Sequence, residues 1–314
     1  MRDAAAKQVV VGVEDAECDA ALRVAAAEAR RRRCGIHLVH VVTPVYVGRP
    51  EVGELTSMAL EIRRAGEVVL AQAHRRLVRL LGEDAGAVRV STELCHSAVV
   101  PALVAAGAHA HVLVLQHRGM GPEGHTRRLS VTLGVAARAR VPVLAVPDAW
   151  RAEPAAEPPV VTVGVVDPTV SSGVVRAAVR EADRMGARLH LVHAAGLPRA
   201  GEDRLEDGSA RTAGASRRLE RELAAGFVQA CAGRPHVPVE VEVVAQPPEA
   251  GLIERARGSS LLVVGRHHAR VPLAPRLGHV VRAVLRRSSC PVLVVEPGPL
   301  IVPEHRDLAT AAVP

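Results

Sequence analysis

The sequence predicts an α/β protein made of two tandem, doubly wound, parallel sheets of five strands each. Residues 261–265 (LLVVG) form a short apolar run that ends in glycine, and a loop, an amphipathic helix and a second apolar run at residues 291–295 follow it. The same arrangement occurs earlier in the chain, where residues 111–115 are its first apolar run and residues 142–146 its last. Such strand–loop–helix–strand units build parallel sheets. Aromatic residues are only 1% of the chain, so we expect cores of valine, leucine and alanine.

The first copy of this arrangement spans residues 1–147. Its strands are valine-rich runs, and its helices are segments in which apolar residues recur every three or four positions. Arginines at residues 30–33 mark the end of the first helix, where positive charge complements the helix dipole. In chain order we expect a strand at Lys7–Val13, a helix at Ala20–Arg33, a strand at Ile36–Val42, a helix at Leu55–Leu81, a strand at Val88–Thr92, a helix at Ala98–Ala108, a strand at His111–Leu115, a helix at Ser130–Arg140 and a strand at Pro142–Val146.

The second copy spans residues 160–297 and follows a stiff linker, residues 148–159, that is rich in alanine, proline and glutamate. The run LHLVH at residues 189–193 repeats IHLVH at residues 36–40 almost letter for letter. Residues 196–213 are expected to be a mobile loop and residues 298–314 a weakly ordered tail. The expected elements are strands at Val160–Val166, Leu189–His193, Val237–Val244, Leu261–Gly265 and Pro291–Val295, and helices at Ser172–Gly186, Ala215–Ala232, Ala250–Arg257 and Gly278–Arg287.

Composition and charge exclude several classes of protein. The net charge is +7, but the arginines follow helix faces, and the near absence of aromatic residues argues against stacking on single-stranded nucleic acid. Five scattered cysteines without a C-x-x-C pair indicate reduced thiols rather than disulfides or a zinc site. No run reaches the length of a membrane span and no signal peptide is evident, so we expect a cytoplasmic protein.

The order of the short motifs resembles the tandem universal stress proteins. The resemblance rests on V-G-V in the first strand, H-L-V-H in the second and a P-V-L-V-V closing strand, and it covers about residues 7–147 and 159–297. It implies a Rossmann-like fold and a role in stress adaptation or dormancy. Many members of that family bind ATP through G-x2-G-x9-G-S/T after the fourth strand, with an aspartate at the end of the first strand. Glycines there let the backbone approach phosphate closely.

Neither copy carries that complete motif. In the second copy Gly265 and Gly278 match the first and third glycines, whereas His268 replaces the second and His279 replaces the hydroxyl residue. Val166 stands at the aspartate position and is followed by Asp167.

The first copy departs from the motif at other positions. Gly119 and Ser130 match the second glycine and the hydroxyl residue, whereas Gln116 and Leu129 replace the first and third glycines. Glu14 stands at the aspartate position, with Asp15 beside it. The candidate nucleotide-binding residues are therefore Gly12, Glu14, Asp15, Val41, Arg118, Gly119, Ser130, Gly164, Asp167, Gly265, Arg266, His268, Gly278 and His279.

Each candidate also has a purely structural interpretation. Gly265 and Gly278 suit either a phosphate cradle or a strand end and a helix start, and Glu14 with Asp15 suits either a ribose contact or a turn cap. His267, His268 and His279 are expected to be surface residues rather than metal ligands. His37 and His40, like His190 and His193, should point to opposite faces of their strands and be rim or core residues.

Two functional hypotheses remain at the level of sequence. The resemblance implies a regulator that binds ATP or another adenine nucleotide, and the departures leave open a scaffold that acts through protein contacts. Neither G-x-S-x-G nor G-x4-G-K-[ST] occurs, so a serine hydrolase and a P-loop enzyme are unsupported, and no catalytic residue is assigned.

The two closing strands, residues 141–146 and 291–295, would each be an apolar edge of a sheet. Apolar edges are normally covered or paired. By analogy with dimers of the family, we expect the two strands to pair with each other and form an internal pseudo-dimer. A homo-oligomer of the whole chain is left open.

Overall fold

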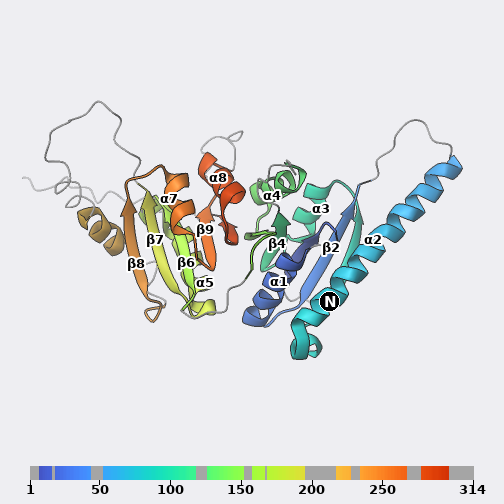
Figure 1. The fold of residues 1–314 in the computed structure, drawn as a ribbon, viewed down its shortest axis with the longest axis horizontal. Coiled ribbons are helices and arrows are strands. Elements are labelled where there is room, and N and C mark those ends of the chain that lie inside the picture. The colour runs from blue at the N-terminus through green and yellow to red at the C-terminus, as the bar shows by residue number, and fades with distance from the viewer. Residues whose placement is uncertain are drawn as a thin grey trace, which may run out of the picture.

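The two halves of the chain form one continuous sheet of ten strands, in the order β3-β2-β1-β4-β5-β10-β9-β6-β7-β8 (Figure 1). The structure is a computed structural model, and it describes residues 7–15, 18–43, 52–117, 126–151, 158–166, 168–194, 217–227, 234–266 and 277–296. The doubly wound arrangement predicted from the sequence is confirmed. Within each half the strands pair in parallel.

The elements of the first half follow the expected order. They are β1 (Val9–Val13), α1 (Asp19–Arg32), β2 (Ile36–Val42), α2 (Val52–Leu81), the 3-10 helix η1 (Gly82–Gly86), β3 (Val90–His96), α3 (Val99–Ala106), β4 (Val112–His117), α4 (Thr126–Arg138) and β5 (Val143–Pro147). Several starts differ from expectation by two to four residues. Helix α4 begins at Thr126 rather than Ser130 and α2 at Val52 rather than Leu55, whereas β1 and β3 begin two residues later than expected, at Val9 and Val90.

The second half repeats this plan. Its elements are β6 (Val160–Val165), α5 (Pro168–Met185), β7 (Arg188–Ala194), β8 (Val239–Val244), α7 (Pro248–Arg255), β9 (Leu261–Gly265), α8 (His279–Arg287) and β10 (Val292–Val295). Residues 217–227 are also helical. The repeat extends to the helix ends: α1 is followed by Arg33 in the left-handed conformation (φ 51°), and α5 is followed by Gly186 in the same conformation (φ 60°). Glycine adopts this conformation without the steric cost that arginine bears.

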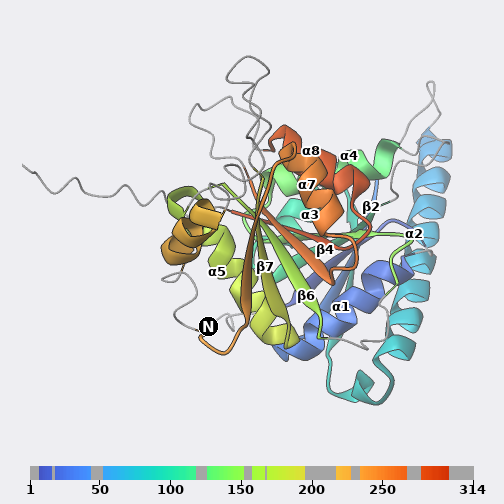
Figure 2. The ribbon, with the colours of Figure 1, turned by 60° about the vertical axis from the view of Figure 1, so that its left-hand side comes forward.

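Two hydrophobic cores cover the two faces of the sheet, and each runs through both halves. Helices α1, α2 and α5 lie on one face, and α3, α4, α7 and α8 lie on the other (Figure 2). The central strands are buried on both faces, which explains why they read as unbroken apolar runs. Trp150, in the predicted linker, packs against both cores. No helix in the described ranges combines the length and the apolar character that a membrane span requires.

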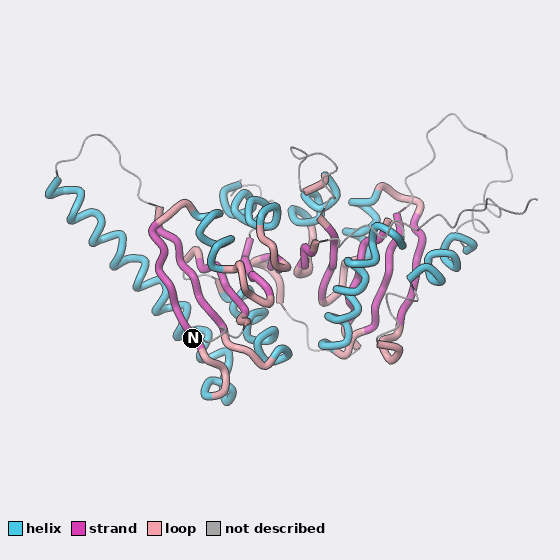
Figure 3. The backbone as a smooth tube through the Cα atoms, turned by 180° about the vertical axis from the view of Figure 1, so that it is seen from behind, coloured by secondary structure: helices cyan, strands magenta, loops and turns pink. Residues whose placement is uncertain are grey.

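The expected pairing of the closing strands is confirmed. Strand β10 pairs antiparallel with β5, with Leu293 opposite Leu144 at the centre of the register. This junction joins the two five-stranded halves edge to edge, as the tube view shows (Figure 3). The apolar edge of each half is therefore covered by the other half.

A buried ion-pair network joins the halves on the face covered by α1 and α5. Arg32 reaches both Glu181 (2.8 Å) and Glu28 (2.7 Å), and all three side chains are at most 9% exposed. Arg31 and Arg184 add a second cation to each carboxylate. The network is nearly symmetric, because Glu28 and Glu181 occupy equivalent positions of the two copies, but Met185 stands where the second half would carry its own Arg32.

Replacing Arg32 with methionine tests how far this network stabilises the junction. Each carboxylate would keep one arginine, so we expect Arg32→Met to lower the free energy of unfolding by about 2–3 kcal/mol, somewhat less than the cost of leaving a buried charge unpaired. Urea unfolding measures the loss. Arg63→Met, which removes an exposed pair with Glu67 on α2, is the control and should cost under about 1 kcal/mol. Equal losses in both variants would contradict the assigned role.

The network also predicts a pH dependence through Glu28. Burial raises the pKa of this carboxyl group, but the charges and hydrogen bonds of Arg31 and Arg32 outweigh burial and hold it below its ordinary value of 4.5. A depressed folded-state pKa contributes stability above pH 4.5 that is lost as the pH falls toward that pKa. The destabilisation caused by Glu28→Gln should therefore be largest near neutral pH and shrink below about pH 4. Urea unfolding of both proteins across this range measures it, and a constant difference would contradict the prediction.

Candidate functional site

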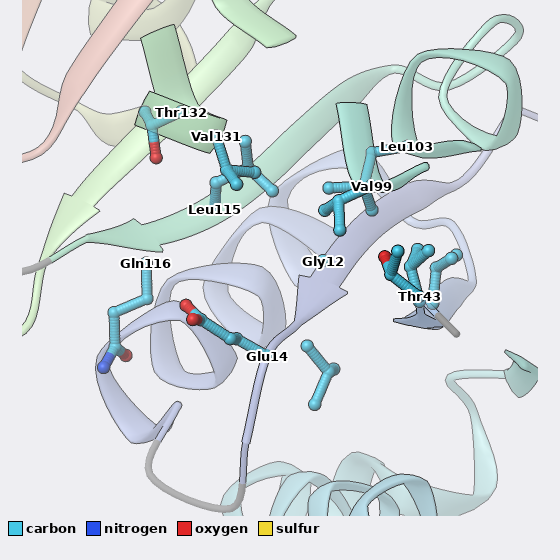
Figure 4. Close-up of a pocket in the computed structure, with 12 residues that line it drawn as sticks. Gly12, Glu14, Thr43, Val99, Leu103, Leu115, Gln116, Val131 and Thr132 are labelled. Atoms are coloured by element: carbon cyan, nitrogen blue, oxygen red, sulfur yellow. The ribbon is translucent and has the colours of Figure 1, made fainter. Parts of the chain in front are cut away.

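A pocket of about 330 Å³ lies at the carboxyl ends of β1, β2 and β4 in the first half (Figure 4). The strand order reverses here, because the chain runs from β1 to β2 and β3 on one side and continues at β4 and β5 on the other. Doubly wound sheets bind ligands at such switch points. The lining residues are Gly12, Val13, Glu14, Val39, Val41, Thr43, Val99, Leu103, Leu115, Gln116, Val131 and Thr132.

The wall of this pocket is about half apolar and half polar. Valine and leucine side chains from β2, α3, β4 and α4 form the apolar part. Glu14 and Gln116 lie at the ends of β1 and β4, and Thr132 projects from α4, as Figure 4 shows. Small-molecule sites usually combine apolar side chains with a few placed polar groups, and both kinds line this pocket.

Gly12 keeps the floor of the pocket open. A Cβ atom at this position would lie 2.5 Å from Leu115 Cδ2 and 3.2 Å from Leu103 Cδ2. Its φ is not in the left-handed region, so the requirement for glycine comes from the close approach of neighbouring side chains rather than from backbone conformation. Gly12, Glu14 and Val41 were all candidates from the sequence, and the structure brings them together in this pocket.

Histidines fix the ends of the strands beside the pocket. His40 Nδ1 donates to the Val13 carbonyl at 2.7 Å, and His193 makes the equivalent contact with Val165 at 3.3 Å. His37 instead pairs with Glu93 at 2.9 Å. The expectation that His37 and His40 lie on opposite faces of β2 is confirmed, because the two rings contact different neighbours.

Gln116 has a structural role that its position in the motif did not reveal. Its Oε1 accepts a hydrogen bond from the backbone nitrogen of Ala21 at 3.1 Å, in the first turn of α1. The first helical N–H groups have no partner within the helix, so this side chain caps α1 from the neighbouring strand. A glycine at residue 116 could not make this bond.

Helix α4 contributes the hydroxyl group of Thr132, and not that of Ser130, to the pocket lining. Helix α4 starts four residues earlier than expected, which places Ser130 inside the helix on an exposed face. Thr132 is 1% exposed and lines the pocket. A helix that begins at Thr126 contains both residues, and their separation of two positions points them to different faces.

In the second half the candidate glycines lie near the corresponding edge of the sheet. Gly164 is in β6 and Gly265 ends the neighbouring strand β9. Gly278 precedes α8 with φ −66°, a conformation open to any residue, so helix initiation does not itself require glycine there. His279 begins α8, and its side chain is 83% exposed, 3.8 Å from Glu249.

Arg266, a candidate phosphate-binding residue from the sequence, has its guanidinium at the junction of the two halves. This residue is 8% exposed, and its guanidinium crosses the junction to donate hydrogen bonds to the carbonyls of Ala139 and Val141 (3.1 Å) in the first half. These carbonyls lie just beyond the C-terminus of α4, where the helix dipole favours a cation. His117, the equivalent residue of the first half, is fully buried.

The remaining candidates are not part of the pocket as described. Asp15 is half-buried beside Glu14 but does not line it. The predicted site residues Arg118, Gly119, Asp167 and His268 lie outside the described residues.

Comparisons with known proteins agree with this architecture. The model of the Universal stress protein family matches residues 5–147 and 160–296. A universal stress protein of Mycolicibacterium smegmatis is 31% identical over 298 residues, covering 92% of this chain and 97% of its own length. One from Mycobacterium tuberculosis is 32% identical over 292 residues, covering 91% of this chain and 96% of its own.

A solved structure gives the same picture of the fold. The crystal structure of a universal stress protein from Archaeoglobus fulgidus aligns with 92% of this chain and 98% of its own, with a TM-score of 0.63 and 18% identity. Because the family model matches both halves and the mycobacterial relatives span nearly the whole length, the chain belongs to the universal stress protein family as a tandem member.

Proposed function

We propose that this protein is a stress-response regulator whose first half binds ATP or another adenine nucleotide in the pocket between β1, β2 and β4. The observation that carries the proposal is the pocket itself. It has a volume of about 330 Å³, it is lined by apolar side chains and by the Glu14 carboxylate, and it lies at the switch point of the sheet. This volume falls within the range of about 300–1,000 Å³ that is usual for small-molecule sites.

The chemistry of the lining suggests how a nucleoside would lie. Val39, Val41 and Leu103 offer an apolar slot for a base. Glu14 can accept hydrogen bonds from ribose hydroxyl groups, which are donors that a carboxylate pairs with well. Thr132 offers a hydroxyl group from α4.

A second candidate function is a scaffold that has lost nucleotide binding. The observation that favours it is the side chain of Gln116, which stands at the first glycine position of the family motif and is engaged in capping α1. A glutamine side chain fixed by this hydrogen bond does not leave the space beside the backbone that glycine leaves for a phosphate.

Analysis of the purified protein distinguishes these two functions. Denaturing protein purified without added nucleotide and chromatographing the supernatant should release an adenine nucleotide at up to one equivalent per chain. Calorimetric titration of ATP into nucleotide-free protein should give the same stoichiometry. The absence of both copurified nucleotide and binding heat up to millimolar ATP would exclude the regulator and leave the scaffold.

A matched pair of glycine variants assigns the site to one half. Gly12→Val should fill the pocket and weaken nucleotide binding at least about tenfold, equivalent to about 1.4 kcal/mol. Gly164→Val, the same change at the equivalent position of the second half, should leave the affinity within about twofold. At both positions the atoms nearest to an added Cβ belong to leucine side chains, so the two changes are matched, and urea unfolding checks that both variants remain folded. The reverse order of affinities would place the site in the second half.

Arg266 gives an independent prediction. Because it binds backbone carbonyls across the junction, Arg266→Met should lower the free energy of unfolding by about 1–3 kcal/mol, the cost of leaving buried acceptors unpaired. The nucleotide affinity should stay within about twofold. A large loss of affinity with unchanged stability would instead return Arg266 to a phosphate-binding role.

A further inference from the structure

Helix α2 presents an exposed face along much of its length that no described element covers. Its inner face is built from Gly66, Leu70, Ala73 and Leu77, which are buried against the sheet. Before Gly66 the described side chains from Ser57 onward are almost all exposed, and the ribbon runs past the end of the sheet (Figure 1). Thus the C-terminal half of α2 packs against the core, whereas its N-terminal half extends beyond the sheet.

The outward face of α2 carries exposed apolar side chains between charged ones, which include Arg64 and Arg79 at its margins. Val68 is 53% exposed, Met58 36% and Val78 36%, and Ala65 and Ala71 are also exposed. Residues separated by three and four positions share one face of a helix, so these side chains form a stripe directed away from the sheet. We call the exposed residues Met58, Glu61, Ala65, Val68, Ala71, Arg75 and Val78 the outer stripe.

The charges of the outer stripe are arranged symmetrically about Val68. Glu61 lies seven positions before Val68 and Arg75 lies seven positions after it. Among the described residues neither side chain has an ion-pair partner. When two helices cross antiparallel at a twofold axis through Val68, Glu61 of each copy comes opposite Arg75 of the other. A single helix therefore carries both halves of a self-complementary charge pattern.

The apolar residues follow the same symmetry. Ala65 and Ala71 lie three positions to either side of Val68, and small side chains there let two helices approach closely. Met58 and Val78 lie ten positions to either side. A shallow hollow lies beside Val78, between His74, Arg75 and Arg79. In the antiparallel arrangement, Met58 of the second copy would lie at this hollow.

We propose that the outer stripe of α2 is a homodimer interface in which two copies of this chain pair antiparallel about Val68. The two halves of one chain already pair through β5 and β10. The contact through α2 would be a separate interface, between two chains. The stripe covers about 30 Å of helix at 1.5 Å per residue, and such a contact buries less than the roughly 1,600 Å² of a standard stable interface. The dimer should therefore be reversible and depend on protein concentration.

Charge reversal tests the proposal in the full-length protein. Sedimentation velocity from about 1 to 200 µM should show a monomer–dimer equilibrium. Glu61→Arg should raise the dissociation constant about tenfold, since it places like charges opposite each other at two symmetric positions. The double variant Glu61→Arg with Arg75→Glu restores opposite charges and should return the constant to within about threefold of the original. A strictly monomeric protein, or a dimer insensitive to Glu61→Arg, would overturn the proposal.

Cross-linking tests the position of the twofold axis. Val68→Cys places two thiols opposite each other, so mild oxidation should give a covalent dimer. Glu67→Cys, an exposed neighbour on a different side of the helix, is the matched control and should not cross-link. Oxidation of the unmodified protein measures any cross-linking by its native thiols. Of these, Cys18 and Cys290 are buried, and Cys34 and Cys95 are half-buried. Equal cross-linking at positions 67 and 68 would refute the proposed axis.

Discussion

Strands β5 and β10 meet over only three residue pairs, yet this antiparallel contact determines the arrangement of everything else. It converts two five-stranded sheets into one and lets each hydrophobic core run through both halves. One arginine from each half secures it on opposite faces of the sheet: Arg32 binds Glu181, and Arg266 binds carbonyls beyond α4. The junction also reaches the first-half pocket through α4, which lines the pocket and is followed by the carbonyls that Arg266 binds.

The fold was predictable because its determinants are local or periodic. Buried parallel strands read as apolar runs, and their repetition in two copies revealed the tandem organisation. The pairing of β5 with β10 followed from the need to cover an apolar edge. Helix starts were less predictable: the sequence predicts a helix from Ser130, whereas α4 begins at Thr126. Local propensity at a helix end is weak compared with packing of the whole helix.

The site was predicted in part, and its misses have a common cause. Gly12, Glu14 and Val41 were found because strand ends can be counted from the sequence. Thr132 was missed because a shift in the start of α4 changes which residue faces the pocket. The bond from Gln116 to α1 and that from Arg266 to the first half join residues distant in sequence, 95 and about 125 positions apart. Such contacts depend on tertiary placement, and no periodicity encodes them.

The junction between the halves also changes how the assembly responds to dilution. A sheet completed by two separate chains falls apart when their concentration drops below the dissociation constant. Here both halves belong to one chain, because β5 ends at Pro147 and the second half begins with β6 at Val160. The effective concentration of one half near the other is therefore on the order of millimolar, whatever the abundance of the protein. The two halves can therefore carry different residues at equivalent positions, as Arg32 and Met185 do, without any competing pairing between identical halves.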